Sequence, residues 1–486
     1  MKCVYHVGIL RCELGTCHRT TANTMLTRTL RRVIFTKRRF HQVPFHEDLT
    51  EVDDDLFNLE GFKHYKEAPD VQALRERLGL LGNEDITPYS KEPQDGKLSE
   101  SGQITQSAAM PSSFVDACKL AQPVVFVSSL SNPYSNLAIE DYIYNQMPLP
   151  AEGNANRLMF YVNSPCVVIG KNQNPWNEVN LPLLNNLRIP LVRRQSGGGT
   201  VVHDSGNVNY SFMTTKEKFD RHTFANLVAS AVNAIPGIEK RIKVTERGDI
   251  VTETDDLKVS GSAYKLSKGK SYHHGTMLLN LNLDVLRQLL HRDIAKVGKV
   301  ESHAAIASVR SPVTNLNISN EAFVEAVSKE FKESYGLVQE QEEQNIEEGE
   351  FNQTDMLGLD AFVQAYSGRD CVVFNIDETT ELTEEVDKVK AHLMNWEWKF
   401  GATTKFTHTF TSTEKGFQVI LSIGKKGLVE SFELVGADEP IKEHFQFLQM
   451  VLDRGDSIRY SGSEVAGFIT DDAISDWLGE SIDGST

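Results

Sequence analysis

Short apolar runs separated by polar turns set the pattern of this chain from about residue 120 onward. The run 123–127 predicts a buried strand, and the helical spacing of apolar residues in 132–147 predicts a helix that starts at a Ser-Asn-Pro cap. The runs 158–162 and 166–170 are split by Asn-Ser-Pro, which predicts a β-hairpin. Compact structure is therefore expected to begin near residue 123.

The same kind of pattern continues toward the C-terminus. Apolar strands are predicted at 187–192, 208–213 and 277–281, and helices near 220–235 and 320–337. The segment that follows carries six glutamates and no basic residue between positions 339 and 350, which indicates a solvated hinge. A second set of elements then predicts another folded unit: helix 383–398, strands 405–412, 417–424 and 428–436, and helix 438–453.

The stretch 193–209, RRQSGGGTVVHDSGNVN, is the first candidate for chemistry. Three consecutive glycines place bare backbone N–H groups where a ligand can approach closely. Arg193 and Arg194 bring charge-assisted donors to the same turn. The combination predicts a cradle for an anionic group, although a flexible hairpin with an incidental arginine pair is the alternative. This is not a Walker loop, because no G-x-x-x-x-G-K-[ST] sequence occurs anywhere in the chain.

The second candidate is Lys258, which lies between Leu257 and Val259 and precedes Ser-Gly-Ser. A lysine in such a place is expected to be half-buried and must find an anion or lose its proton. The alternative is an ordinary surface lysine on an edge strand. His273 and His274 are adjacent on a predicted strand, so they should point to opposite faces and form a poor metal pair.

Composition narrows the function classes. The chain is 40% hydrophobic and 24% charged, as expected of a globular protein, and no apolar run approaches the ~18 residues of a membrane span. The net charge of −17 argues against general binding to nucleic acid or anionic membranes. The six cysteines include no C-x-x-C pair, which indicates neither a disulfide framework nor a zinc site and suggests a reduced, intracellular protein.

Residues 1–46 are rich in arginine and contain one acidic residue, Glu13. This composition is typical of a mitochondrial transit peptide and predicts the mitochondrial matrix as the location. A disordered basic tail is the alternative. Residues 47–120 alternate short helical pieces with polar stretches and predict a poorly ordered linker.

Several motifs together resemble one family. RRQSGGGTVVHDSGN, KVSGSAY, HHGTMLLN, SVRSPVTNL, NWEWKFG and VVIGKNQNPW are similar to motifs of the lipoate–protein ligase A family, in its order and spacing over roughly 123–480. The likeness is to the mitochondrial, eukaryotic type, with an N-terminal extension and a C-terminal accessory domain. It implies an α+β fold, in which a mixed-sheet biotin/lipoate ligase catalytic domain precedes a small α+β accessory domain. The expected parts are a transit peptide (1–46), a linker (47–120), a catalytic domain (121–338), an acidic hinge (339–355) and an accessory domain (356–486).

The resemblance implies an ATP-dependent ligase with a two-step reaction. The lipoate carboxylate attacks the α-phosphorus of ATP to give lipoyl-AMP, and the ε-amine of a lysine on a lipoyl domain then attacks the acyl carbonyl. Both steps develop negative charge that a fixed cation and preorganised donors stabilise. The expected cofactors are ATP and Mg²⁺, with lipoate as substrate and no residue assigned as a metal ligand.

The resemblance also assigns residues. Lys258 is the expected catalytic residue, and Arg194, Lys258 and His274 are the expected lipoate contacts. The expected partners are the lipoyl domains of 2-oxoacid dehydrogenase E2 subunits and the glycine cleavage H protein, with no nucleic acid, no membrane span and a monomeric state. The residues expected to bind ATP or lipoyl-AMP are Arg194, Ser196, Gly198, Gly199, Thr200, Val201, Val202, His203, Asp249 and Lys258.

Two positions depart from the family pattern: Gln195 replaces a frequent serine, and Gly248 replaces a frequent asparagine before Asp249. The second change leaves the nucleotide preference less well defined. The main rival is a lipoyl or octanoyl transferase that takes a preformed acyl-nucleotide, carrier protein or acyl-CoA without its own ATP activation. Biotin ligation is disfavoured because a GRGR-type loop is missing, and a non-catalytic binding module is disfavoured because Lys258 is present.

Overall fold

The computed structural model describes residues 111–149, 154–302, 304–338 and 369–485. The predicted transit peptide (1–46) and acidic hinge (339–355) lie outside the described residues, as does the predicted linker up to residue 110. These assignments stay predictions. Within the described part of the chain, no helix is both long and apolar enough to cross a membrane.

The folded region begins earlier than predicted. Helix α3 (Phe114–Lys119) lies within the segment assigned to the linker, and Ser113 caps it by accepting a hydrogen bond from the N–H of Asp116. Its buried residues Phe114, Ala117 and Cys118 are spaced i, i+3, i+4, so they fall on one helical face and join the core beside α4. The end of the predicted linker is therefore ordered, because this apolar face is long enough to pack.

The largest sheet is mixed, as expected for the fold. Two parallel pairs lie at one edge and the remaining pairs are antiparallel. In order across the sheet the strands are β14 (Val372–Ile376), β1 (Val124–Ser128), β2 (Arg157–Tyr161), β6 (Asn207–Thr215), β10 (Lys270–Leu278), β9 (Lys258–Ser267), β8 (Ile250–Thr252) and β7 (Ile242–Val244).

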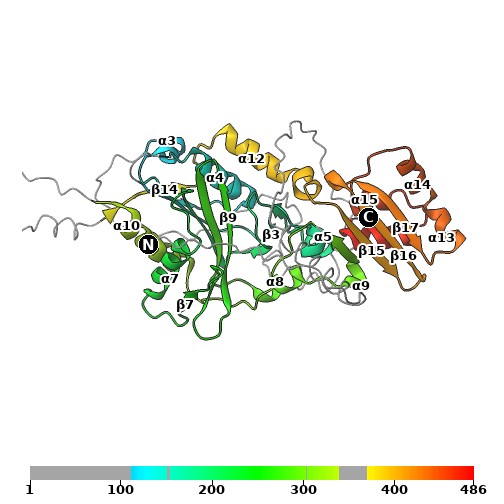
Figure 1. The fold of residues 1–486 in the computed structure, drawn as a ribbon, viewed down its shortest axis with the longest axis horizontal. Helices are drawn as coiled ribbons and strands as arrows, with labels where there is room; N and C mark the ends of the chain where they lie inside the picture. The colour runs from blue at the N-terminus through cyan, green and yellow to red at the C-terminus, as the bar shows by residue number, and fades with distance from the viewer. Residues whose placement is uncertain (1–110, 150–153, 303, 339–368, 486) are drawn as a thin grey trace, which may run out of the picture. The chain divides into compact units, whose positions relative to one another are not determined.

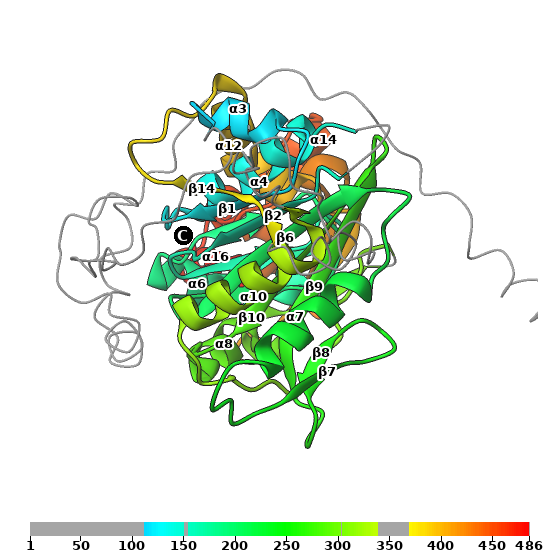
Figure 2. The same cartoon turned by 90° about the vertical axis from the view of Figure 1, so that its left-hand side faces the viewer.

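Helices cover both faces of this sheet (Figures 1 and 2): α3 and α4 (Pro133–Gln146) lie on one face, and α7 (Thr223–Asn233) and α10 (Asn320–Tyr335) on the other. Alternate residues of a strand serve alternate cores, so Val124 packs with α3 and α4 whereas Val125 packs with α7 and α10. Because both faces are covered, β6 is almost wholly buried, including the polar residues Asn207, Asn209 and Ser211 on one of its faces.

The predicted hairpin of 158–162 and 166–170 is wrong. The partners of β2 in the large sheet are β1 and β6, whereas β3 (Cys166–Ile169) forms a separate three-stranded sheet with β4 (Leu191–Arg193) and β5 (Val201–His203). Both edges of β2 are thus occupied by strands distant in sequence, and the Asn-Ser-Pro turn leads out of one sheet into another.

The predicted strand 187–192 is also shorter in the structure. Residues Leu181–Leu187 form helix α6, which ends at Arg188 in a left-handed conformation (φ 54°), and only Leu191–Arg193 pairs as β4. The apolar run was divided between a helix end and a strand, which apolar character alone does not reveal.

The C-terminal region is built on a second, four-stranded antiparallel sheet. Its first strand comes from the predicted catalytic segment, and the other three come from the predicted accessory segment. In order the strands are β11 (Lys299–Ser302), β15 (Phe406–Ser412), β16 (Phe417–Ile423) and β17 (Val429–Val435).

Two elements that follow the predicted hinge lie against the first sheet. Strand β14 pairs with β1, and helix α12 (Glu384–Met394) packs along α4. The division into a catalytic and an accessory domain stays a prediction. The remaining elements are α5 (Pro175–Glu178), α8 (Leu283–Leu290), α9 (Ile294–Val297), β12 (Leu337–Val338), β13 (Arg369–Asp370), the π-helix η3 (Glu397–Gly401), the 3₁₀-helix η4 (Lys425–Gly427), α13 (Glu439–His444), α14 (Gln446–Asp453), α15 (Gly462–Ala466) and α16 (Asp472–Ile482).

Candidate active site

The glycine loop, defined as residues 194–200 between β4 and β5, is organised around Arg194. This side chain is buried, and its guanidinium donates to the carbonyls of Gly197 and Gly199, both at 2.7 Å from Nη2. Nε donates to the hydroxyl of Ser196 at 3.0 Å. Burial lowers the pKa of Arg194 to about 10, which still leaves the group charged at neutral pH. Arg194 therefore shapes the loop from within.

Unlike the carbonyls that Arg194 holds, the backbone N–H groups of the loop are available to a ligand. From Gln195 to Gly199, no backbone N–H has a hydrogen-bond partner among the described residues, whereas the N–H of Thr200 donates to Oγ of Ser308 at 2.9 Å. Successive unpaired N–H groups form a concavity that attracts anions. With carbonyls held by Arg194 and N–H groups left available, the loop has the polarity of an anion cradle.

The three glycines differ in what surrounds them. Gly198 has φ +91°, and a Cβ there would lie 2.8 Å from Nη2 of Arg194. A Cβ on Gly199 would lie 3.2 Å from Oγ of Ser308, whereas one on Gly197 would meet nothing within 4 Å. A Cβ on Gly170, at the end of β3, would collide with the carbonyl oxygen of Gly198. The close packing that requires glycine thus centres on Gly198 and Gly170.

A second layer of side chains supports Thr200, and the sequence did not identify it as part of the site. Gln173 accepts hydrogen bonds from the N–H of Gly170 at 2.8 Å and from the hydroxyl of Thr200 at 3.0 Å, and it donates to Oγ of Ser308 at 2.9 Å. The carboxylate of Glu178 accepts from the N–H of Ser308. Gln173 and Ser308 both lie in motifs that resemble the family, and this resemblance is the sequence signal that could have identified them as site residues.

Lys258 opens β9 and is half-buried, as predicted, with 22% of its side chain exposed. Its Nζ lies 2.7 Å from Oδ1 of Asp249, which is 21% exposed. The backbone of Lys258 is fixed by two hydrogen bonds, to the carbonyl of Pro312 and from the N–H of Thr314. Since Ser308 of the same segment contacts the glycine loop, residues 308–314 connect Lys258 to that loop.

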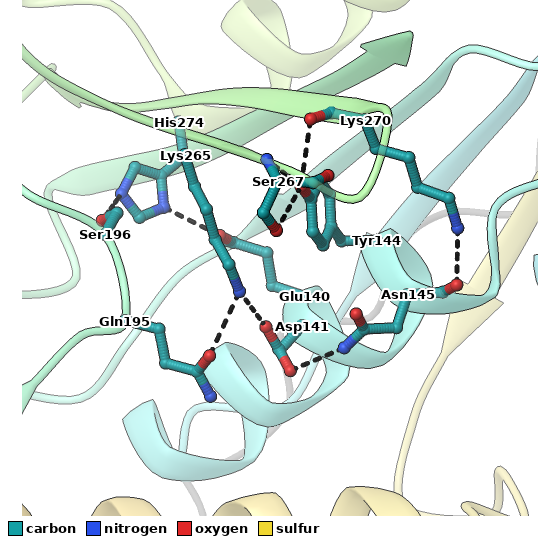
Figure 3. Close-up of polar contacts among 10 residues, drawn as sticks. All are labelled: Glu140, Asp141, Tyr144, Asn145, Gln195, Ser196, Lys265, Ser267, Lys270 and His274. Atoms are coloured by element: carbon teal, nitrogen blue, oxygen red, sulfur yellow. Dashed lines mark hydrogen bonds and ion pairs between the residues drawn. The ribbon is translucent and has the colours of Figure 1, made fainter. Parts of the chain in front are cut away.

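His274 lies inside a buried polar chain that starts on the glycine loop (Figure 3). Nε2 of His274 is 2.7 Å from Oγ of Ser196, and Nδ1 is 2.7 Å from Oε1 of Glu140 on α4. The other oxygen of Glu140 accepts from the hydroxyl of Tyr161 at 2.9 Å. An ionised carboxylate only accepts, so Nδ1 carries a proton, and in the neutral ring Nε2 accepts from Ser196.

A parallel connection runs beside the first one in Figure 3. Lys265 of β9 donates to Oδ1 of Asp141 at 2.8 Å and to Oε1 of Gln195 at 3.1 Å. Its ammonium also lies 5.0 Å from the ring centre of Tyr144 and 5.7 Å from that of Tyr272. Consecutive loop residues, 195 and 196, are thus tied to consecutive helix residues, 141 and 140.

The remaining predicted residues lie on β5, at the end of the loop. Val202 is buried and Val201 is half-buried. His203 is buried, with Nδ1 3.0 Å from Nδ2 of Asn163 and Nε2 without a partner in the described part of the chain. Burial, reinforced by the charge of Arg194, lowers the pKa of His203 to about 3, so this ring is neutral.

The structure thus brings most of the predicted residues to one place. The glycine loop and His274 form one network, β5 continues directly from the loop, and Lys258 with Asp249 joins the network through residues 308–314. His273 faces the other side of β10, as expected, where it contacts Tyr210 and Phe224. Among the described residues, no three His, Cys, Asp or Glu side chains gather as a metal site.

Comparison with known proteins identifies the family of this site. Residues 132–335 match the model of the lipoyl protein ligase A/B catalytic domain. A Schizosaccharomyces pombe protein named "Putative lipoate-protein ligase A" is 33% identical over 313 residues, which cover 63% of this chain and 78% of that protein. A Saccharomyces cerevisiae protein of the same name is 36% identical over 284 residues, or 58% of this chain and 61% of that protein. The matched region therefore spans less than two thirds of the Saccharomyces cerevisiae protein.

Among solved structures, "P. falciparum LipL1 in complex lipoate" aligns with a TM-score of 0.44 and 23% sequence identity, covering 73% of this chain and 97% of that chain.

Proposed function

The chain belongs to the lipoate–protein ligase A family, and we propose on this basis that it is an ATP-dependent ligase that attaches lipoate to proteins. In this proposal the enzyme activates lipoate as lipoyl-AMP and transfers the lipoyl group to a lysine of a lipoyl domain. The observation that carries the proposal is the glycine loop. Its five N–H groups from Gln195 to Gly199 have no partner in the described part of the chain, and the loop is linked through residues 308–314 to Lys258.

In the first step negative charge develops on phosphate oxygens, and the backbone N–H groups of the glycine loop are suited to stabilise it. The lipoate carboxylate oxygen forms a bond to the α-phosphorus while the bond to the β-phosphate oxygen breaks and pyrophosphate leaves. Backbone N–H groups and the ammonium of Lys258 supply donors that are already in position, which is where such catalysis gains most. Asp249 holds the ammonium of Lys258 in place until the nucleotide binds and its phosphate also pairs with that ammonium.

In the second step the amine of the acceptor lysine attacks the acyl carbonyl, the bond to the phosphate oxygen breaks and AMP leaves. Negative charge develops on the carbonyl oxygen, and Lys258 is the positioned cation that stabilises it in this proposal. We propose the lipoyl domains of 2-oxoacid dehydrogenase E2 subunits and the glycine cleavage H protein as acceptors, and a monomeric enzyme.

Magnesium would be held mainly by the nucleotide. Mg²⁺ commonly uses one or two carboxylates together with substrate phosphates, and Asp249 is the carboxylate that lies beside Lys258. The ion would neutralise part of the polyphosphate charge. One carboxylate fits such a shared site, and among the described residues no cluster of side chains could hold the ion without the nucleotide.

A cysteine-dependent transferase is disfavoured within the described residues. Cys166 is fully buried in β3, and burial raises its pKa well above the ordinary value, so it is no ready nucleophile. Burial likewise raises the pKa of Cys118 and of Cys371 to about 12. A transferase that relies on lysine alone remains the alternative.

The deciding experiment is ATP–pyrophosphate exchange driven by free lipoate. Exchange by the purified protein supports the ligase. No exchange, with intact transfer from acyl-nucleotide, acyl-carrier protein or acyl-CoA to a lipoyl domain, supports the transferase. We further propose that the protein works in the mitochondrial matrix, because residues 1–46 have the composition of a transit peptide.

A further inference from the structure

Arg193 precedes the glycine loop and was predicted as a ligand-binding donor together with Arg194. Its side chain is instead fully buried, with 0% exposure, and it connects two regions of the chain. On one side, Nη1 donates to the carbonyls of Lys171 and Gln173 at 2.9 and 2.8 Å. On the other, Nε and Nη2 donate to the carbonyl of Lys399, and Nη2 also donates to Oγ1 of Thr403 at 2.8 Å.

These contacts use all five N–H donors of the guanidinium. None of the acceptors is a carboxylate, so the buried charge is held by neutral dipoles alone, and burial lowers its pKa to about 9. An apolar side chain would avoid the desolvation that this arrangement requires. A planar fork that satisfies two separate backbone segments at once is what arginine offers and lysine does not.

The C-terminal end of this connection is the π-helix η3, a rare form that is frequent at functional sites. Trp398 of the same turn donates from its indole N–H to the carbonyl of Arg193 at 2.7 Å, so the contact runs in both directions. Phe400 packs on Trp176 of α5, and Trp176 also stacks on Phe406 of the second sheet. The π-helix η3 is thereby joined both to the segment around the glycine loop and to the second sheet.

The other end leads directly to the glycine loop. Arg193 fixes the carbonyl of Gln173, and the side chain of Gln173 contacts Gly170, Thr200 and Ser308. Thr200 in turn donates its N–H to Ser308. A continuous series of hydrogen bonds therefore extends from Thr403 in the C-terminal region to Thr200 at the end of the loop.

We propose that Arg193 is a positioning residue through which the C-terminal region, by way of η3, sets the geometry of the nucleotide-binding loop. The inference rests on the proposed function of that loop. Arg193 itself is sequestered from any ligand and acts through Gln173. Loosening η3 should therefore weaken nucleotide binding even though η3 and the loop are separated by some two hundred residues of chain.

The test compares two ends of one connection in the full-length protein. Arg193→Lys keeps the charge but cannot reach both segments, and Thr403→Val removes one acceptor on the C-terminal side. Lipoate-driven ATP–pyrophosphate exchange is measured at varied ATP and at varied lipoate. We expect Arg193→Lys to raise the KM for ATP on the order of tenfold and Thr403→Val to raise it about threefold, with the KM for lipoate unchanged.

Two further variants separate positioning from general loss of structure. Lys442→Gln removes an exposed ion pair with Glu439 inside α13, an element that is not part of the Arg193 connection, and it should leave both KM values at the wild-type level. In the double variant Arg193→Lys/Thr403→Val, the effects on the KM for ATP should be less than multiplicative, because both changes break one connection.

A folded Arg193→Lys protein with a wild-type KM for ATP overturns the proposal. So does a Thr403→Val protein with an unchanged KM for ATP, since the C-terminal end would then have no influence. Equal loss for ATP and lipoate, in proportion to a lowered melting temperature, also overturns it. Failure of the wild-type protein to catalyse exchange is a separate result, which counts against the proposed ligase function.

Discussion

Gly198 lies directly against the guanidinium of Arg194: a methyl group added to this glycine would stand 2.8 Å from Nη2. The same nitrogen donates to the carbonyls on either side of Gly198, those of Gly197 and Gly199. The arginine thus occupies the space that a side chain at Gly198 would need. Arg194 engages the carbonyls of Gly197 and Gly199 and leaves the backbone N–H groups of the loop available to a ligand.

The first prediction contrasts two neighbouring glycines. Gly198→Ala combines a collision with Arg194 and a φ of +91°, whereas a Cβ at Gly197 meets nothing within 4 Å. We expect Gly198→Ala to weaken lipoyl-AMP binding at least tenfold, equivalent to about 1.4 kcal/mol, and Gly197→Ala to stay close to wild type. Calorimetric titration with lipoyl-AMP, alongside thermal unfolding, measures both effects.

Gly199→Ala should fall between these two, because its Cβ would press on the movable Oγ of Ser308 at 3.2 Å. If Gly198→Ala loses thermal stability but binds lipoyl-AMP normally, the loop is a structural turn and the nucleotide binds elsewhere. Equal behaviour of the Gly197 and Gly198 variants would contradict the packing argument.

The glycine loop and Lys258 could be found from the sequence because their signals are local. Consecutive glycines mark a close backbone approach, and a lysine between Leu257 and Val259 predicts the half-buried position that the structure shows. Glu140 could not be found in this way, since an acidic residue in a helix usually faces solvent. Its burial depends on His274, which lies 134 residues further along the chain.

The wrong predictions for the turn after β2 and for Arg193 also result from contacts between residues that are distant in sequence. The Asn-Ser-Pro turn after β2 has hairpin chemistry, but β6 and β1 occupy both edges of that strand. Arg193 and Arg194 are adjacent and chemically identical, yet one is bound to η3 and the other to the glycine loop. Long-range pairing decides both cases, and it leaves no mark on a local window of sequence.

A second prediction concerns targeting. Removing residues 1–46 should leave ATP–pyrophosphate exchange unchanged in the purified protein, because no predicted site residue lies in that segment. In cells the shortened protein should remain in the cytosol, which fluorescence microscopy of a tagged protein can measure against the full-length control. Import of the shortened protein into the matrix would rule out the transit-peptide assignment.

A third prediction concerns pH and Asp483, at the end of α16. Burial raises the pKa of this carboxyl from 3.8 to about 6, despite hydrogen bonds from Ser485. A raised pKa means that the folded state binds the proton more tightly, so the stability gained is fully present below about pH 4 and is lost as the pH rises through 6.

Asp483→Asn keeps an acceptor oxygen and removes the titration. Relative to wild type, the variant should gain stability between about pH 4 and pH 7, by up to about 3 kcal/mol, since one pKa unit corresponds to about 1.4 kcal/mol. Melting temperatures of both proteins across this range provide the measurement. A difference that does not change with pH would show that Asp483 titrates normally in the folded state.

The last prediction tests Lys258 as the positioned cation. Lys258→Ala should reduce lipoate-driven ATP–pyrophosphate exchange by about 10²–10³-fold or more, because one preorganised electrostatic contact to a developing charge is worth several kcal/mol. The fold should survive, since Lys258 is partly exposed and its β-strand contacts are made by the backbone. Its removal leaves Asp249 without this partner, but that carboxylate is itself 21% exposed and can be hydrated.

Lys243→Ala is the matched control on β7, which is separated from the strand of Lys258 by β8. Lys243 also forms an ion pair at 2.7 Å, with Asp256, but its side chain is 45% exposed and belongs to none of the site's hydrogen-bond networks. Exchange by this variant should equal that of wild type, as expected for a surface ion pair. If Lys258→Ala is folded by circular dichroism and retains near-normal exchange, Lys258 has no part in adenylate formation. Loss of exchange in Lys258→Ala alone, with unchanged melting temperature, is the outcome that the half-buried Lys258–Asp249 pair predicts.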